Sequence, residues 1–134
     1  MADTGNETKG ALFKAAREAM RHAHAPYSND FRVGAAILGG SGEIFGGCNV
    51  ENASFPEGWC AETSAIAAMV TAGERRIAEI AVVAERMPRI TPCGGCRQRI
   101  AEFATRDTLV HLCDETGVVE TVTIADLLPK AFSM

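Results

Sequence analysis

The run Ile77-Ala78-Glu79-Ile80-Ala81-Val82-Val83-Ala84 contains one charged residue, Glu79, and is otherwise apolar. A short, nearly continuous apolar run is typical of a strand that is buried on both faces of a sheet. After Pro92 the sequence predicts a helix over residues 93–103 and a further strand over residues 109–113. This strand–helix–strand order predicts two parallel strands joined by a crossover helix.

The chain before this unit predicts a helix, a hairpin and a second helix. Apolar residues at helical spacing indicate an amphipathic helix from residue 11 to about residue 24. Residues 33–38 and 43–49 read as two strands joined by a glycine-rich turn, which is a β-hairpin. A loop over residues 49–59 then leads into a helix over residues 61–73.

The end of the chain adds a strand over residues 118–123 and a short helix or coil over residues 124–132. Strands that alternate with helices predict a single α/β domain over residues 1–134, a three-layer α/β/α sandwich with a mixed five-stranded sheet. Residues 1–10 are small and polar, and we expect them to be flexible. The helices that begin near residues 61 and 93 should start at the same end of the sheet.

Composition limits the possible functions. With 134 residues, 47% of them hydrophobic, the chain has enough apolar material for one core without disulfides. A net charge of -4 disfavours nucleic-acid binding and favours a small substrate. An odd number of cysteines, five, and a polar N-terminus predict a cytoplasmic protein without disulfides. No apolar stretch approaches the roughly 20 residues that cross a bilayer, so we expect no membrane role.

Cysteines stand at the predicted start of both central helices. Cys60 precedes one helix, and Cys93 and Cys96 begin the other in the sequence Pro-Cys-Gly-Gly-Cys. A catalytic zinc ion typically has three protein ligands and one open position, and a helix N-terminus favours the thiolate form that the metal requires. The sequence therefore predicts a zinc site made by these three cysteines.

Two other interpretations of the cysteines stay open at this point. A lone Cys-x-x-Cys is also typical of a redox pair, although Cys60 would then be coincidental. A closed structural zinc site would need a fourth ligand, for which Cys48 and Cys113 are candidates. Both lie in predicted strands, where a small buried thiol is the usual finding.

Glu62 lies two residues beyond the ligand Cys60. A carboxylate there can reach a water molecule on the metal without binding the metal, and can take a proton from it and return the proton to a leaving group. Taken alone, a glutamate in the first turn of a helix more simply favours the helix dipole. Only the three nearby cysteines make the catalytic interpretation the better one.

The whole pattern resembles the small, homotetrameric, zinc-dependent cytidine deaminases. The resemblance extends over nearly the whole chain. It is carried by Ala25-Pro26-Tyr27-Ser28, Phe31, Val33-Gly34-Ala35-Ala36, Gly47-Cys48-Asn49-Val50-Glu51-Asn52-Ala53, Cys60-Ala61-Glu62, Pro92-Cys93-Gly94-Gly95-Cys96-Arg97-Gln98 and Leu127-Leu128-Pro129-Lys130-Ala131-Phe132.

The resemblance implies a set of substrate contacts. Asn49 and Glu51 would hydrogen-bond the ribose hydroxyls, Phe31 would stack on the pyrimidine, and the backbone around Ala61 and Thr91 would read the base edge. An amide and a carboxylate two residues apart in an extended segment point the same way and can share a diol. Judged alone, the asparagine also fits a turn residue and the phenylalanine a core residue.

The resemblance also implies a homotetramer with one zinc ion per subunit. In that family neighbouring subunits close each pocket, so Phe55 and Phe132 are expected to approach the ligand of an adjacent chain. Ordinary packing at a subunit interface is the alternative for both rings.

Two features depart from the family pattern. Relatives often have Pro-Tyr-Ser, one residue and then Phe, whereas here Asn29-Asp30 adds one residue before Phe31. Many relatives have arginine directly after Cys-Ala-Glu, where its charge offsets that of zinc with three thiolates, and here Thr63 takes that position. We hypothesise that Arg97 supplies the missing charge and that Gln98 donates a hydrogen bond to a ligand sulfur.

The reaction implied is the zinc-dependent hydrolytic deamination of cytidine and deoxycytidine to uridine, deoxyuridine and ammonia, in pyrimidine salvage. Glu62 would protonate N3 of the base and then the departing amine. The alternatives are a sister deaminase for another aminopyrimidine such as a nucleoside antibiotic, a non-catalytic zinc protein, and an editing deaminase on RNA or DNA. The acidic composition disfavours the last of these.

Overall fold

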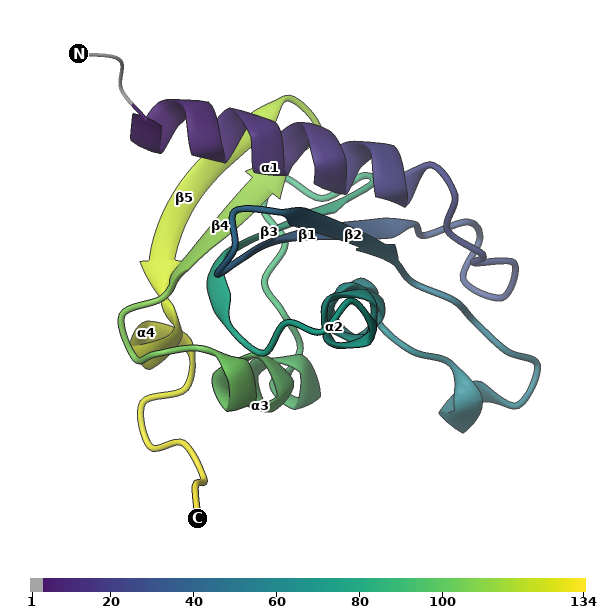
Figure 1. The fold of residues 1–134 in the computed structure, drawn as a ribbon. Helices are drawn as coiled ribbons and strands as arrows, with labels where there is room; N and C mark the ends of the chain where they lie inside the picture. The colour runs from purple at the N-terminus through teal and green to yellow at the C-terminus, as the bar shows by residue number, and fades with distance from the viewer. Residues whose placement is uncertain (1–3) are drawn as a thin grey trace.

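A computed structural model describes residues 4–134 and contains one five-stranded sheet with helices on both of its faces (Figure 1). The elements are α1 (Thr4–Met20), β1 (Val33–Gly39), β2 (Ile44–Cys48), the 3-10 helix η1 (Phe55–Glu57), α2 (Ala61–Thr71), β3 (Ile77–Ala84), α3 (Gly94–Phe103), β4 (Leu109–Asp114), β5 (Gly117–Thr123) and α4 (Ile124–Leu127). None of the helices within residues 4–134 has both the length and the apolar character that are needed to span a bilayer.

The sheet has the strand order β2-β1-β3-β4-β5. β3 lies at its centre and has the predicted bounds, and its residues 80–84 are all buried. It pairs antiparallel with β1 and parallel with β4, while β1–β2 and β4–β5 are antiparallel pairs. The predicted mixed sheet is therefore confirmed, including the parallel pair joined by α3.

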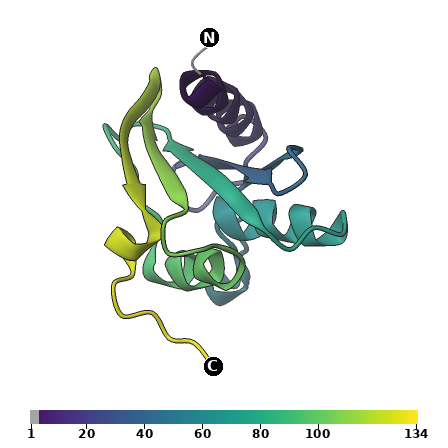
Figure 2. The ribbon, with the colours of Figure 1, turned by 60° about the vertical axis from the view of Figure 1, so that its left-hand side comes forward.

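The three predicted layers are also confirmed. α1 covers one face of the sheet, and α2 and α3 cover the other (Figures 1 and 2). The core is divided in the same way, because Leu12 and Ala16 of α1 pack in one apolar cluster with Ala81 and Cys113. Ala65 and Met69 of α2 belong to the second cluster, on the opposite face.

The first helix begins earlier than the sequence predicts. It starts at Thr4 rather than Ala11, so residues 4–10, which were expected to be flexible, are helical; residues 1–3 lie outside the described residues. Once an apolar stripe has fixed a helix, each added residue gains one backbone hydrogen bond, so polar residues can extend it. The helix also ends at Met20 instead of near His24.

The packing of α2 on β2 fixes where the second helix begins. A Cβ atom at Gly47 of β2 would lie 2.3 Å from the backbone nitrogen of Ala65 and 2.6 Å from the carbonyl oxygen of Ala61. Only glycine allows so close an approach of strand and helix backbones. Gly47 thus sets the position of the first turn of α2, which carries Cys60 and Glu62.

Candidate active site

The N-termini of α2 and α3 meet, and three cysteine sulfurs lie together there. Cys60 is the N-cap of α2 and Cys93 is the N-cap of α3, both with extended backbone, and neither side chain caps its own helix. The Sγ atoms of Cys60 and Cys93 are 3.7 Å apart, and with Cys96 all three lie within 4.8 Å of one another. Tetrahedral zinc with Zn–S bonds of about 2.3 Å places sulfur pairs about 3.8 Å apart, so the cluster fits one zinc ion.

The protonation chemistry of the cluster also suits a metal. The Cys60 and Cys96 sulfurs share a hydrogen bond, which lowers the pKa of the Cys60 thiol. The same hydrogen bond, followed by burial, raises the pKa of the Cys96 thiol. Sulfurs this close do not all ionise unaided, and a divalent cation is the group that stabilises several adjacent thiolates.

A fourth cysteine does not complete the cluster. Within residues 4–134, neither Cys48 nor Cys113 belongs to the group of ligand atoms at the 4.8 Å spacing. Cys113 packs on the α1 face of the sheet, opposite α2, and burial raises its pKa to about 11. The closed four-cysteine site considered above is therefore wrong, and the cluster has the three-ligand form that leaves one metal position open.

Glu62 is buried in the first turn of α2, with 4% of its surface exposed. Burial raises the pKa of its carboxyl group, and its own backbone N–H and the charge of Arg99 offset part of that effect. A carboxylate with raised proton affinity beside an open metal position is suited to taking a proton from water and passing it on.

A cavity of about 480 Å³ opens beside Glu62, within the range typical of small-molecule sites. It is lined by Tyr27, Ser28, Val33, Asn49, Val50, Glu51, Asn52, Phe55, Gly58, Trp59, Cys60, Ala61, Glu62, Ile90, Thr91 and Cys93. Tyr27, Trp59 and Ile90 were not predicted as site residues, although Tyr27 belongs to the Pro-Tyr-Ser motif and Trp59 directly precedes Cys60.

Asn49 and Glu51 reach the cavity from the segment after β2, and both also hold the loop between α1 and β1. The Asn49 side chain accepts a hydrogen bond from the Val33 N–H at 2.8 Å and donates one to the Phe31 carbonyl at 3.0 Å. The Glu51 carboxylate accepts from the Tyr27 N–H at 2.7 Å, and from the N–H and hydroxyl of Ser28.

These contacts leave both side chains able to bind a ligand. A carboxylate has about four acceptor positions and an amide nitrogen two donor hydrogens. The hydrogen bond from the Ser28 hydroxyl is the main cause that lowers the pKa of Glu51, so this side chain is an anion that accepts hydrogen bonds at neutral pH.

The predicted stacking role of Phe31 is not supported, because this residue does not line the cavity and Val33 does. Asn29 and Asp30 both adopt left-handed backbone, with φ of 58° and 57°, and so accommodate the additional residue in the turn. The Phe31 ring lies instead near Arg86, whose guanidinium carbon is 5.9 Å from the ring centroid.

The structure does not support the hypothesis that Arg97 supplies charge to the cluster and that Gln98 donates to a ligand sulfur, because both side chains have other partners. Arg97 donates to the carbonyls of Pro92 and Leu127, at 2.8 and 3.0 Å. Gln98 donates to the carbonyl of Phe132 at 3.1 Å. Both side chains tie α3 to other parts of the chain, because residues one and two positions after Cys96 do not share its face of the helix.

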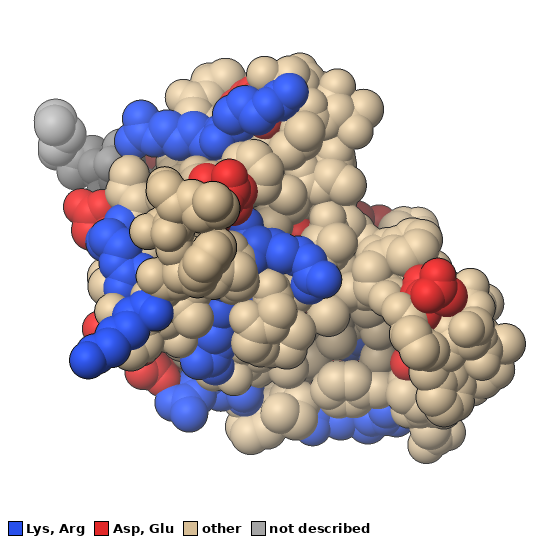
Figure 3. Space-filling view, turned by 90° about the horizontal axis from the view of Figure 1, so that it is seen from below, with Lys and Arg blue, Asp and Glu red and all other residues tan. Residues whose placement is uncertain are grey.

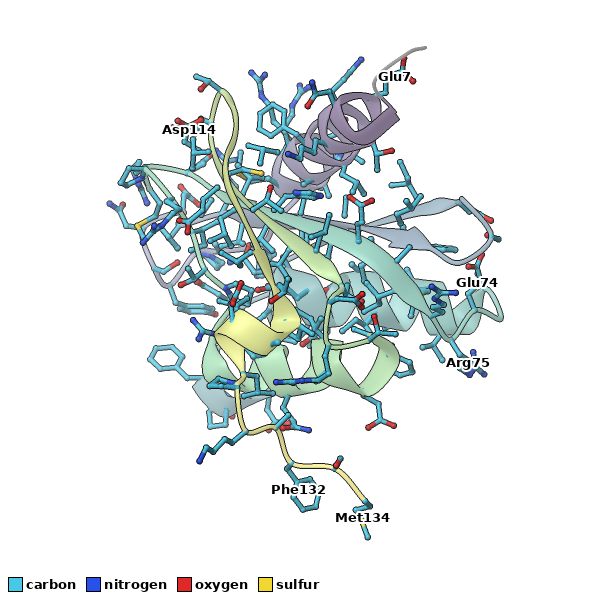
Figure 4. All side chains as sticks on the ribbon, turned by 90° about the vertical axis from the view of Figure 1, so that its left-hand side faces the viewer. Glu7, Glu74, Arg75, Asp114, Phe132 and Met134 are labelled. Carbon is cyan, nitrogen blue, oxygen red and sulfur yellow. The ribbon has the colours of Figure 1, made fainter. Side chains whose placement is uncertain are left out.

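The two aromatic residues predicted to meet a neighbouring subunit have different positions. Phe55 lines the cavity, is 73% exposed, and has its ring centroid 5.8 Å from that of Tyr27. Phe132 is 71% exposed on the C-terminal segment, away from the body of the domain (Figure 4), and does not line the cavity of its own chain.

The profile of the "Cytidine and deoxycytidylate deaminase zinc-binding region" matches residues 6–112, a span that includes all three clustered cysteines. The chain belongs to this deaminase family. A cytidine deaminase from Sporosarcina psychrophila is 43% identical over 122 residues, which cover 91% of this chain and 89% of that protein.

Solved structures of cytidine deaminases agree with this membership of the deaminase family. The structure from Burkholderia pseudomallei is 46% identical, with a TM-score of 0.86, and the match covers 92% of this chain and 98% of that one. The structure from Mycobacterium tuberculosis is 34% identical with a TM-score of 0.83, and the match covers all of both chains. The predicted family and fold are thus confirmed.

Proposed function

We propose that this chain hydrolyses the C4 amino group of cytidine and deoxycytidine, giving uridine or deoxyuridine and ammonia. The observation that carries the proposal is the buried Glu62 beside a three-sulfur cluster, at a cavity of nucleoside size. Cys60, Cys93 and Cys96 would hold one zinc ion, which when bound activates a water molecule as a nucleophile near neutral pH.

Glu62 carries the protons of the reaction in this proposal. Its carboxylate takes one proton from the attacking water and delivers it to N3 of the pyrimidine as the oxygen adds to C4. It then moves the second proton of that oxygen to the amino group, so that ammonia leaves as the carbonyl of uridine forms. The raised pKa of the carboxyl group supports this role, because an effective proton carrier has a pKa near the working pH.

Asn49 and Glu51 bind the sugar in this proposal, and the backbone around Ala61 and Thr91 reads the base edge. All four residues line the cavity together with Glu62. A site that uses hydrogen bonds to recognise hydroxyl groups rejects ligands without them, because its own polar groups would be left unpaired.

The substrate is a free nucleoside rather than a nucleic acid in this proposal. Figure 3 shows the face that carries α2 and α3, where basic side chains stand in separate groups with acidic and uncharged surface between them. The net charge of -4 points the same way. We also propose that the enzyme acts in pyrimidine salvage in the cytoplasm.

We further propose a homotetramer in which neighbouring subunits help to close each cavity. Tyr27, Phe55 and Trp59 line the cavity, and each has about half or more of its surface exposed. Phe132 is exposed on the C-terminal segment. Large exposed aromatic groups beside a binding site are typical of surfaces that another chain covers.

The direct test follows the ultraviolet absorbance of cytidine, deoxycytidine and free cytosine mixed with zinc-quantified protein. We expect loss of the cytidine and deoxycytidine bands, release of ammonia, and little reaction with cytosine, which lacks the sugar. No reaction with either nucleoside at one zinc ion per chain would refute the proposal and favour another aminopyrimidine substrate. Light scattering of the same sample measures the tetramer.

A further inference from the structure

The proposed zinc site has no positively charged residue at position 63, directly after Glu62. Zinc with three thiolates carries a net charge of -1, and the buried Glu62 carboxylate adds another negative charge when ionised. Thr63 is neutral, and the guanidinium of Arg97 is engaged with the backbone carbonyls of Pro92 and Leu127. Neither of these residues brings a positively charged donor to a ligand sulfur.

Arg99 of α3 does reach the cluster. Its Nη1 atom donates to the Cys96 sulfur at 3.8 Å, from three positions further along the same helix. Residues three apart share one face of a helix, which is the geometry that Arg97 and Gln98 lack. The positive charge of Arg99 also acts on the Glu62 carboxylate across the cluster.

Thr63 approaches the same sulfur from the other helix. Its hydroxyl oxygen is 3.7 Å from the Cys96 sulfur, so a residue at position 63 of α2 and a residue at position 99 of α3 meet at one ligand. A side chain can therefore donate to the Cys96 sulfur from position 63 or from position 99, and in this chain the arginine is at position 99.

The surroundings of Arg99 leave it available for this contact. None of the ion pairs formed within residues 4–134 includes Arg99, and no other Lys or Arg in that part of the chain donates to a clustered sulfur. Gly95 lies one turn before Arg99, and a Cβ atom there would lie 3.2 Å from Nη1. Because glycine has no Cβ atom, the guanidinium has room at this position. Water screens the interaction in part, because Arg99 is exposed.

We propose that Arg99 is a positioning residue of the zinc site, whose guanidinium donates to the Cys96 thiolate and offsets the negative charge of the metal centre in place of an arginine at position 63. The inference rests on the zinc site of the proposed function. A positively charged donor at the sulfur stabilises the zinc–thiolate complex, which carries a net negative charge. Its loss should weaken zinc binding and not only turnover.

The experiment measures zinc affinity by competition with a chromophoric chelator. The variants are Arg99→Gln, Arg99→Lys, and Arg99→Gln combined with Thr63→Arg. The control is Arg21→Gln, which removes a surface charge directly after α1, on the other side of the sheet. We expect Arg99→Gln to bind zinc about tenfold more weakly, as is usual when a partner of a metal ligand is lost. Arg99→Lys should keep part of the affinity, and Thr63→Arg should restore it.

Cobalt substitution gives a second readout that a purely structural role would not change. The sulfur-to-cobalt charge-transfer band should shift in Arg99→Gln and return in the double variant. The inference would be overturned if Arg99→Gln bound zinc as tightly as wild type, or if Arg21→Gln lost as much zinc affinity as Arg99→Gln. Either result would leave the proposed function intact. A wild-type protein that binds no zinc would overturn both the inference and the proposed function.

Discussion

The sulfurs of Cys60 and Cys93 lie 3.7 Å apart although 33 positions separate them in the chain. Each residue is the N-cap of a different helix, and these helices cover the same face of the sheet (Figure 2). The metal site is thus a property of the fold, because the packing of two helices on one sheet brings its ligands together.

Replacement of a clustered cysteine should remove the metal. We expect Cys93→Ser to lose bound zinc and to have a lower Tm, because an ion that binds only the folded state stabilises it. Cys48→Ser is the matched control, since this cysteine does not belong to the cluster. Metal content and thermal unfolding check both variants, and full zinc occupancy in Cys93→Ser would contradict the ligand assignment.

Glu51 should affect substrate binding more than the chemical step. Glu51→Gln keeps the shape of the side chain but loses the charge-assisted hydrogen bonds that a carboxylate makes. We expect KM for cytidine to rise about tenfold or more while kcat changes much less. Steady-state kinetics separate the two constants, and the assignment fails if kcat falls while KM stays constant.

The α2–β2 contact should depend on the absence of a side chain at position 47. A Cβ atom in Gly47→Ala would meet backbone atoms of Ala65 and Ala61, which cannot rotate away. Overpacking of this kind typically costs about 1–3 kcal/mol, and the displacement of α2 should also weaken zinc binding. Denaturant unfolding and zinc titration measure the two effects, and wild-type values for both would show that the contact is adaptable.

The early start of α1 gives an independent prediction. Gly10 is inside α1 and a Cβ atom there would contact nothing within 4 Å. Gly10→Ala should therefore raise the free energy of unfolding by up to about 1 kcal/mol, the difference in helix propensity between the two residues. The absence of any stabilisation would indicate that the helix does not include this position.

Much of this architecture could be predicted from the sequence, and the differences have local causes. β3 was predicted with its bounds because its apolar run signals burial on both faces of the sheet. The start of α1 was placed too late because the polar residues before Ala11 carry no apolar periodicity.

Site residues that belong to sequence motifs could be predicted, whereas those that depend on three-dimensional geometry could not. The cysteines and Glu62 were predicted because spacing and helix starts encode them. Arg99 was missed because Arg97 and Gln98 belong to the recognisable motif, whereas contact with the Cys96 sulfur depends on the helical repeat. Phe31 was placed in the cavity because the left-handed conformations of the Asn29-Asp30 turn leave little signal in the sequence.

The burial of Glu62 has a consequence for stability that depends on pH. Its pKa is raised in the folded state, so the folded carboxyl group holds its proton more tightly than the unfolded one. Stability is therefore lost as the pH rises from the unfolded pKa through the folded pKa, and the cost is absent below about pH 4.

Glu62→Gln avoids that cost. In chelator-treated protein we expect this variant to have a higher Tm than wild type at pH 7, and a difference that shrinks toward pH 4. Thermal unfolding across this pH range provides the check, and a variant less stable than wild type at neutral pH would argue against a desolvation penalty at this carboxylate.

The role of Glu62 as proton carrier is tested by comparing the turnover of cytidine by wild type and Glu62→Gln at equal zinc occupancy. We expect the variant to fold, to bind one zinc ion per chain, and to lose activity by at least about a hundredfold, since proton transfer by a positioned side chain contributes roughly 10²- to 10⁴-fold. A fully zinc-loaded Glu62→Gln that deaminates cytidine at the wild-type rate would contradict this role, because the protons would then be carried by another group.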